Sequence, residues 1–369
     1  MTAPHATLIA TQPIPARPAP VRHEGALRWL RAKLLGDWPT ALTTLCIAAL
    51  MLYALPPLLD WTVWQAVWLP RLEACRAEGA GACWGVVAEK YRFILLGRYP
   101  FEEQWRPVVA TGLMLALVII SCIRTCWRPW LVIAWAAGLL AGFVLMYGNT
   151  LGLSRVETDR WGGLPLTLLL ATLSIALSFP LALLIALGRR SNMPAIRVLC
   201  TVYVELVRGV PLVSVLFMAS FMFPLLLPQG LSIDVLLRVL AGIALFAAAY
   251  TAEVIRGGLQ AVPRGQLEAA ATLGLGYWQT QRLVVLPQAL ATVLPGLMNN
   301  FIAIFKDTSL VTIVSLYELT GSLSLALNSD ADWRAFKLEG YLFIALIYFG
   351  FCFALSRYSL WVERRLQQV

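Results

Sequence analysis

Two stretches of the sequence, 164–188 and 283–305, contain no charged residue. An α-helix that crosses the hydrocarbon core of a bilayer needs about 20 predominantly apolar residues, and both stretches meet that length. Hydrophobic residues make up 59% of the 369-residue chain and charged residues only 13%, roughly half the charged share of a soluble domain. Such a chain cannot cover its surface with polar groups in water. The sequence therefore predicts an all-α membrane protein.

Further apolar stretches bring the expected number of transmembrane helices to about eight. The stretch 198–227 is the least regular because Glu205, Arg208, Gly209 and Pro211 interrupt it. The expected spans are 39–59, 107–123, 129–147, 164–188, 198–227, 235–252, 283–305 and 340–361.

The loops between these spans divide by charge. Alternate loops, starting with the N-terminal segment, carry sixteen Lys and Arg against five acids, whereas the remaining loops carry eleven against fourteen. Because cytoplasmic loops are enriched in Lys and Arg, this division predicts that both termini are cytoplasmic. The net charge of +9 thus reflects membrane topology, and no nucleic-acid partner is expected.

Three regions follow from the spacing of the spans. Residues 1–38 form a Pro-rich segment that is expected to be a disordered cytoplasmic tail, and both histidines of the chain, His5 and His23, lie in it. Residues 39–160 are expected to form a three-helix extension with a long exported loop, and 161–369 the remaining five spans.

Two of the seven cysteines, Cys75 and Cys83, lie in the predicted exported loop. Gly79 and Gly81 between them allow the chain to fold back, and exported compartments favour disulfide formation. A local Cys75–Cys83 disulfide is therefore predicted. The alternative is that all seven cysteines are reduced packing residues.

Motifs of enzyme chemistry are missing from the sequence. None of the four lysines follows a glycine, so the chain has no GxxxxGK[ST] phosphate-binding loop and is not expected to hydrolyse ATP. Scattered cysteines without a histidine in the membrane region make a metal site unexpected. The chain is therefore predicted not to be an enzyme.

The loop 261–287 has the pattern of a compact helical knob. A short helix is expected over about Gln266–Leu273, followed by a redirection at Gly274, because glycine adopts backbone conformations that a Cβ disfavours. A second helix is expected to end at Pro287, and Glu268 in the first turn of the first helix suits the helix dipole. On these grounds alone the loop is either a docking element for a partner or an amphipathic connector on the membrane surface.

A family resemblance decides between the two interpretations of this loop. Glu268–Ala270 is followed after three residues by Gly274, and after nine more by Val284–Pro287. This spacing resembles the EAA loop of ABC-importer permeases, with Val284 in place of the isoleucine of that pattern. The resemblance implies a coupling helix that inserts into a cleft of a cytoplasmic ATPase. It assigns this role to Glu268, Ala269, Ala270, Gly274, Leu286 and Pro287.

Three more segments extend the resemblance over about 162–365. Gly163–Thr167 (GLPLT), Tyr203–Leu212 (YVELVRGVPL) and Phe305–Leu310 (FKDTSL) are similar to segments of polar amino-acid permeases. The resemblance implies that the last five helices form a type I ABC-importer permease core in a bacterial inner membrane. It also implies import of L-amino acids from periplasm to cytoplasm. The N-terminal spans resemble those of the larger permease of general L-amino-acid systems.

The resemblance further implies a set of partners. A second permease, with a heterodimer favoured over a homodimer, would complete the pathway beside membrane lipid. A dimer of ABC ATPases would bind ATP and Mg²⁺, no cofactor being expected in this chain, and a periplasmic amino-acid-binding protein would deliver substrate. The alternative, a stand-alone secondary amino-acid transporter or channel, predicts internal repeats or several intramembrane acids. No internal repeat is visible in the sequence, and Glu205 is the one acid clearly inside an expected span.

The polar residues within the spans allow two interpretations each. Glu205 and Arg208 are three residues apart and could pair on one helix face, or they could line the substrate path. Buried Asn299 and Asn300 could bridge helices or form a polar wall for a zwitterionic substrate. A last group could meet an entering amino acid, or could cap the helix and contact the binding protein. That group is Lys306, Asp307, Thr308 and Ser309.

Overall fold

The computed structural model describes residues 33–150 and 152–366, and every element named in these ranges is a helix. The predicted tail, with His5 and His23, lies almost entirely outside the described residues. The chain divides into two compact units, one of residues 1–66 with 78–82 and one of 67–77 with 83–369. The predicted boundary near residue 160 falls inside the second unit.

The first unit contains one long apolar helix. Helix α2 covers Trp38–Leu59 and continues into a π-helical turn, η1, over Asp60–Trp64. Together they are long and apolar enough to cross a membrane. Pro56 and Pro57 lie inside α2, and the wider turn follows directly. Proline has no backbone N–H to donate, and a π turn is compatible with the hydrogen bonds that are therefore missing from the helix.

The second unit holds six further uninterrupted spans. They are Phe101–Cys122, Trp130–Tyr147, Gly163–Arg189, Val235–Ala261, Tyr277–Val314 and Arg334–Arg364. Their main helices are α5 (Trp105–Cys122), α6 (Trp130–Tyr147), α7 (Gly163–Arg189), α10 (Val235–Ala261), α13 (Leu286–Asp307) and α15 (Lys337–Leu366). Helices α7 and α10 pack closely along their length, and α13 packs on α10. The described residues thus contain seven candidate spans, or eight when one bent helix pair is counted as a span.

That bent pair is the stretch whose irregularity the sequence indicates. Helix α8 (Pro194–Gly209) ends where Pro211 begins the next segment, and α9 (Leu212–Phe217) continues through η5 (Met218–Met222) and η6 (Phe223–Leu226). The two halves are bent by 104°. Val210 has the extended backbone that a following proline favours, so the helix cannot run through this point.

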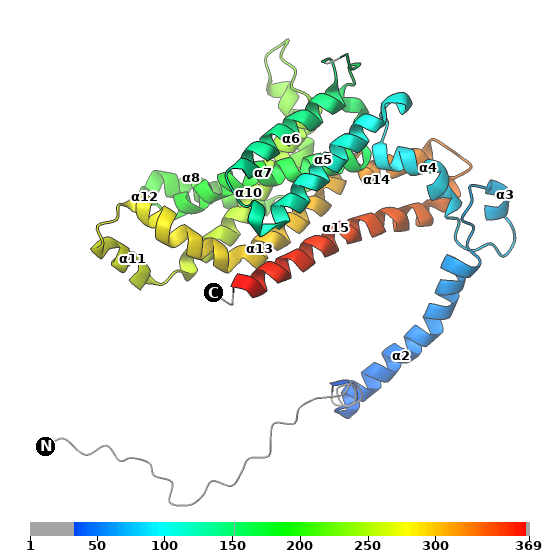
Figure 1. Cartoon of the computed structure of the whole chain (residues 1–369), viewed down its shortest axis with the longest axis horizontal. Helices are drawn as coiled ribbons and strands as arrows, with labels where there is room; N and C mark the ends of the chain where they lie inside the picture. The colour runs from blue at the N-terminus through cyan, green and yellow to red at the C-terminus, as the bar shows by residue number, and fades with distance from the viewer. Residues whose placement is uncertain (1–32, 151, 367–369) are drawn as a thin grey trace, which may run out of the picture. The chain divides into compact units, whose positions relative to one another are not determined.

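Shorter helices complete the second unit. Helix α4 (Gly85–Leu96) packs against α14 (Leu319–Asn328) and α7. Helices α11 (Arg264–Thr272) and α12 (Tyr277–Thr280) lie at one end of this unit, whereas α4 and α14 lie at the opposite end (Figure 1). The others are α3 (Leu72–Cys75), η2 (Phe101–Glu103), η3 (Arg124–Cys126), η4 (Thr158–Arg160), η7 (Gln281–Val285), η8 (Thr308–Val314) and η9 (Arg334–Phe336).

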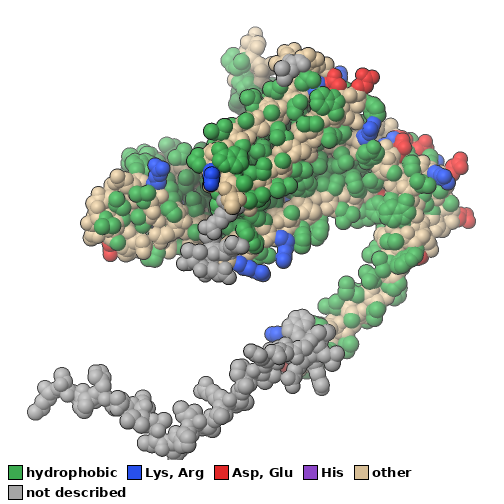
Figure 2. Space-filling view, viewed as in Figure 1, with side chains coloured by type: hydrophobic (Ala, Val, Ile, Leu, Met, Phe, Trp, Pro, Cys, Tyr) green, Lys and Arg blue, Asp and Glu red, His purple; other side chains and the backbone are tan. Residues whose placement is uncertain are grey.

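Hydrophobic side chains cover much of the outer surface of the helices, with few charged side chains among them (Figure 2). Exposed examples include Ile119, Val132 and Leu184, each more than 60% accessible. Such a surface would be unstable in water but matches the hydrocarbon core of a bilayer. The prediction of an all-α membrane protein is confirmed.

A disulfide and two ion pairs stabilise the α4–α14 end. Cys75 and Cys83, the predicted pair, form a disulfide with a Cα–Cα distance of 5.4 Å. Next to it, Arg76 contacts Asp332 at 2.9 Å and Lys90 contacts Asp330 at 2.7 Å. These contacts join the predicted exported loop to the segment between α14 and α15.

Gly163 fixes the start of α7 at the same end. Its φ is +62°, and its backbone N–H lies 3.0 Å from both the Tyr317 carbonyl oxygen and the Ser322 hydroxyl. A Cβ at this position would overlap the carbonyl group of Leu95 in α4. Only glycine tolerates both the backbone conformation and this close approach.

Candidate functional site

The loop 261–287 forms a helical knob at the other end of the second unit. Helix α11 begins at Arg264, two residues before the predicted start, and ends at Thr272, one residue before the predicted end. Gly274 has a φ of +72°, and its N–H donates to the Ala271 carbonyl at 3.0 Å. The N–H of Leu275 donates to the Ala270 carbonyl at 3.1 Å, which closes the helix end. The predicted redirection at Gly274 is therefore present.

The tip of this knob is apolar and exposed. Leu273 is 78% accessible, Trp278 70% and Tyr277 56%, while Ala270 is buried beneath them at 2%. Glu268 and Ala269 are also exposed, on the same helix. Large apolar side chains gathered on a projecting loop are typical of a surface that binds another protein.

Two details predicted for the loop are wrong. Pro287 does not end a helix, because α12 runs through the π turn η7 into α13, and Pro287 is taken up in the first turn of α13. The wide turn accommodates a residue that cannot donate a backbone hydrogen bond. Glu268 is the fifth residue of α11 rather than a first-turn residue, so the helix dipole acts on it only weakly.

Between the middle of α10 and the C-terminal part of α13 lies a partly open cavity of about 240 Å³. Asn300 and Asp307 of α13 contribute its polar groups, and they lie seven residues, or two helical turns, apart. The side-chain amide nitrogen of Asn300 is buried and has no hydrogen-bond partner among the described residues. Asn300 and Asp307 thus place an amide side chain and a carboxylate on the same wall of the cavity. Its full lining is Phe246, Ala247, Tyr250, Asn300, Ala303, Ile304 and Asp307.

The other predicted polar residues of this helix do not line the cavity. Asn299 and Lys306 are exposed, and Ser309 is half-buried. Thr308 is buried, and its hydroxyl donates to the Phe305 carbonyl at 2.7 Å. The structure therefore brings together Asn300 and Asp307 and leaves the remaining four outside this cavity.

Glu205 and Arg208 do not form the predicted pair with each other. Glu205 accepts from Arg189 of α7 at 3.1 Å, while the Arg208 guanidinium lies 5.6 Å from the centre of the Tyr250 ring. Both side chains lie on α8, but each has a closer partner on a neighbouring helix. Tertiary contacts thus replace the local pairing that the spacing suggests.

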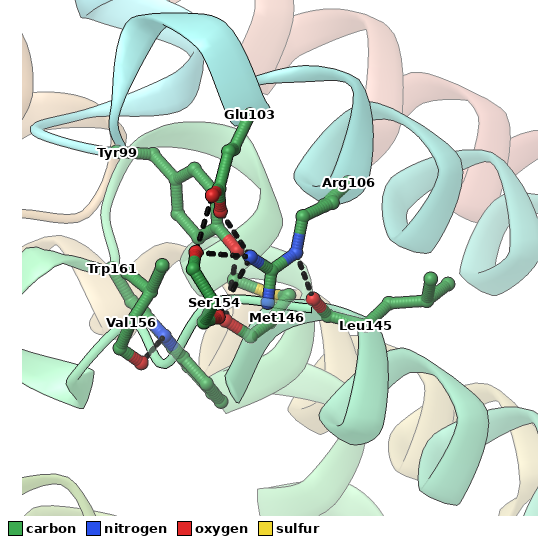
Figure 3. Close-up of polar contacts among 8 residues, drawn as sticks. All are labelled: Tyr99, Glu103, Arg106, Leu145, Met146, Ser154, Val156 and Trp161. Carbon is green, nitrogen blue, oxygen red and sulfur yellow. Dashed lines mark hydrogen bonds and ion pairs between the residues drawn. The ribbon is translucent and has the colours of Figure 1, made fainter. Parts of the chain in front are cut away.

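Sequence reasoning missed the buried arginine Arg106. It lies at the start of α5, is 0% exposed, and contacts Glu103 and the carbonyl oxygens of Leu145 (2.6 Å) and Ser154 (3.0 Å) (Figure 3). Tyr99 lies next to Arg106, and burial of its own hydroxyl raises the pKa of Tyr99 to about 12. The only sequence signal was an arginine three residues after a glutamate at the edge of an apolar stretch. This cluster ties the start of α5 to the end of α6.

The cavity residues Phe246 and Tyr250 were also missed. They occur four residues apart on α10, and their ring centres lie 4.9 Å apart. An aromatic pair at this spacing is most often part of a hydrophobic core. This pair differs from such core packing only because it lines the same cavity as Asn300.

The fold and the projecting knob define a class of protein, a membrane subunit of an ABC importer. Residues 178–368 match the family described as the binding-protein-dependent transport system inner membrane component, and the chain belongs to this family. It is a multi-pass inner membrane permease, and ATP hydrolysis resides in a separate subunit. Membership of this family decides against the stand-alone transporter or channel.

Similar proteins match nearly the whole chain. The inner membrane amino-acid ABC transporter permease protein YhdY of Escherichia coli is 46% identical over 357 residues, which are 95% of this chain and 96% of that protein. The glutamate/glutamine/aspartate/asparagine transport system permease protein BztC of Rhodobacter capsulatus is 37% identical, over 98% of each chain. A solved structure, the crystal structure of an amino acid ABC transporter with histidines, is 32% identical over 55% of this chain and 92% of that one, with a TM-score of 0.49.

Proposed function

We propose that this chain is the permease subunit of an ABC importer for L-amino acids and that its loop 261–287 receives the ATPase. The full-length similarity to YhdY and BztC, both named as amino-acid transport permeases, supports the substrate class. The exposed apolar tip of α11 and α12 supports the docking role, and it is the observation that carries the proposal. Glu268, Ala269, Ala270 and Gly274 belong to the knob, and Leu286 and Pro287 begin α13, which follows it.

In this proposal the chain is one half of a translocation pathway. A second permease, in a heterodimer rather than a homodimer, completes the pathway, and a periplasmic amino-acid-binding protein delivers substrate. Two ATPase subunits hold ATP and Mg²⁺ and dock on the loops. The charge of the loops supports an orientation with both termini in the cytoplasm, which places the knob on the ATPase side.

The cavity between α10 and α13 is proposed as part of the substrate path. The unpartnered amide nitrogen of Asn300 can donate to a substrate carboxylate, and the Asp307 carboxylate can accept from an ammonium group. Burial of these groups strengthens each interaction because little water competes. The three-helix extension 39–160 is proposed to add an exported surface rather than a transport pathway.

Co-purification with the ATPase tests the docking proposal. Leu273→Asp places a charge on the apolar tip of the knob and should abolish recovery of the ATPase subunit with the tagged permease. Glu268→Lys should weaken recovery because it reverses a charge on the exposed face of α11. Leu231→Asp, which alters a comparably exposed leucine in the loop before α10, is the matched control and should leave recovery unchanged.

Uptake of individual radiolabelled L-amino acids tests the substrate proposal in the same preparation. Asn300→Ala should raise the apparent KM while leaving the melting temperature close to that of wild type. Asn299→Ala, on the exposed neighbour, should change neither quantity.

The co-purification test has a clear negative outcome. If the Leu273→Asp variant recovers the ATPase as well as wild type does, the proposed docking role of the loop is wrong.

A further inference from the structure

Four charged side chains meet where α7, α8 and α10 come together. Arg189 of α7 contacts Glu253 of α10 at 2.6 Å and Glu205 of α8 at 3.1 Å, and Arg256 of α10 contacts Glu253. We call Arg189, Glu205, Glu253 and Arg256 the three-helix charge cluster. Two positive and two negative groups balance within it, so the cluster can be held close to the membrane without an unpaired charge.

This cluster is connected to the knob through the end of α10. The guanidinium of Arg190, beside Arg189, donates to the Leu259 carbonyl at 2.5 Å in the last turn of α10, and α11 begins three residues after α10 ends. Val262 at this junction and Val285 at the far side of the loop belong to one buried apolar cluster with Val204 of α8. A displacement of the knob therefore displaces the end of α10, because close-packed interiors transmit movement rather than absorb it.

Glu205 is the least buried member of the cluster. Its side chain is 62% accessible, compared with 12% for Arg189 and 24% for Glu253. Arg189 and Glu253 would remain paired without it, so the fold does not need Glu205 to neutralise a buried charge. What Glu205 adds is an attachment of α8 to the pair formed by α7 and α10.

The same C-terminal turn of α8 that carries Glu205 also contacts the cavity wall. Arg208, three residues after Glu205, places its guanidinium 5.6 Å from the centre of the Tyr250 ring, and Tyr250 lines the cavity with Asn300 and Asp307. A cation over an aromatic face is attracted by the ring quadrupole and restricts the position of the ring. Directly after Arg208 the chain bends by 104°, so α8 ends at this contact.

We propose that α8 links the coupling knob to the substrate cavity, with Glu205 as its attachment on the knob side and Arg208 as the residue that positions Tyr250 on the cavity wall. Neither residue contacts substrate in this proposal, and both are positioning residues. Movement of the α10 end reaches α8 through Arg189 and Glu205, and movement of α8 reaches the cavity through Arg208 and the Tyr250 ring. The inference rests on the proposed function of an ATP-driven importer.

The test uses the complete transporter in proteoliposomes, with its ATPase and binding protein, and measures both ATP hydrolysis and uptake of radiolabelled L-amino acids. Glu205→Gln should preserve ATP hydrolysis and lower the amino acid imported per ATP by about two- to five-fold, as expected for the loss of one partly exposed ion pair. Arg208→Gln should raise the KM for uptake by about two- to five-fold, as expected for one cation–π contact, and Arg208→Lys should restore part of it. Arg197→Gln, on an exposed arginine of the same helix, is the matched control and should behave as wild type.

A double substitution decides whether Arg208 acts through Tyr250. Tyr250→Leu should raise the KM by itself, and Arg208→Gln added to it should raise the KM no further, since residues that act through one contact are not additive. Additive effects on KM, or an unchanged uptake-to-ATP ratio in Glu205→Gln, would overturn the inference. A variant could instead lose yield and maximal rate equally while its KM and its amount of amino acid imported per ATP stay unchanged. That result would indicate a merely structural role for the residue and would also overturn the inference. A wild-type complex without substrate-stimulated ATP hydrolysis would instead refute the proposed function, and the inference with it.

Discussion

The two ends of the second unit use glycine in opposite ways. Gly163, at the α4–α14 end, has a positive φ and sits against the backbone of Leu95, so a Cβ has no room there. Gly274, in the knob, has a similar positive φ, but no atom lies within 4 Å of the position that a Cβ would take. The difference indicates that one end is assembled by close internal packing, whereas the turn at the other end is free of internal contacts, which suits the docking role proposed for it.

The largest loss of stability is expected from adding a side chain at Gly163, where the surrounding backbone leaves no room for one. Gly163→Val should destabilise the protein by about 3 kcal/mol or more, because it combines the cost of a left-handed backbone for a branched residue with overpacking. The yield of folded protein in detergent and its thermal unfolding would measure this. A variant as stable as wild type would show that α4 does not pack tightly on the start of α7.

Removing the buried arginine should have the next largest effect. Arg106→Leu deletes the contacts to Leu145, Ser154 and Glu103 and is expected to cost about 3 kcal/mol, the range for breaking a largely buried ion pair. Thermal unfolding and protease sensitivity of the segment after α6 are the measurements. Arg98→Leu, at an exposed arginine of the same end, is the control and should cost much less.

The disulfide should contribute somewhat less than either. By the chain-entropy estimate, closing a loop this short stabilises the folded state by about 2–3 kcal/mol, less any strain. The double variant Cys75→Ser, Cys83→Ser should therefore have a lower melting temperature without losing ATPase association. Mass mapping of protein purified without reductant checks the bond itself, and a free thiol at Cys75 would contradict it.

Two kinds of sequence information gave different results. The short helix and the turn at Gly274 were predicted because their determinants are local, within a dozen positions of the sequence. The disulfide pair was predicted because its cysteines are eight residues apart. The irregularity of the stretch 198–227 was also indicated locally, by Gly209 and Pro211.

Contacts between distant segments could not be predicted in this way. The partner of Glu205 is sixteen residues away on another helix, and Arg106 contacts residues 39 and 48 positions later. The spacing rule for one helix favoured Arg208 as the partner of Glu205, but packing of α7 on α8 overrode it. Pro287 was misread because a π turn, which has no sequence signature here, allows the helix to continue.

A small stability effect with a large functional effect is expected in the knob. Gly274→Ala should cost only about 1 kcal/mol, the penalty of a left-handed conformation in open space. Uptake should nevertheless fall severalfold, because a turn that is about 1 kcal/mol less favourable holds α11 and α12 in their docking arrangement for a smaller fraction of the time. Parallel measurement of melting temperature and uptake tests this, and normal uptake would remove the distinction between the two ends.

The smallest effect is expected from the ion pair of Lys90 and Asp330. The hydrogen bond from Lys90 holds the pKa of the Asp330 carboxyl below its usual range. A carboxyl with a lowered folded pKa stabilises the protein above its unfolded pKa, near 4, and this contribution is lost as the pH falls through the lower folded value. Asp330→Asn should therefore narrow the difference in melting temperature between pH 6 and pH 3. An unchanged difference would show that this pair does not hold the α4–α14 end together.

The contacts around the disulfide also constrain the order in which the chain can be completed during synthesis. Cys75 and Cys83 can meet as soon as their own loop has been made, but the groups that contact this loop are made much later: the Cys83 N–H donates to Glu339 and Arg76 binds Asp332, each 256 residues later. Until α14 and α15 have been made, the apolar residues of this end remain uncovered. A chain that stops before these two helices would therefore expose an unfinished apolar surface, by which a quality-control protease could distinguish it from the complete protein.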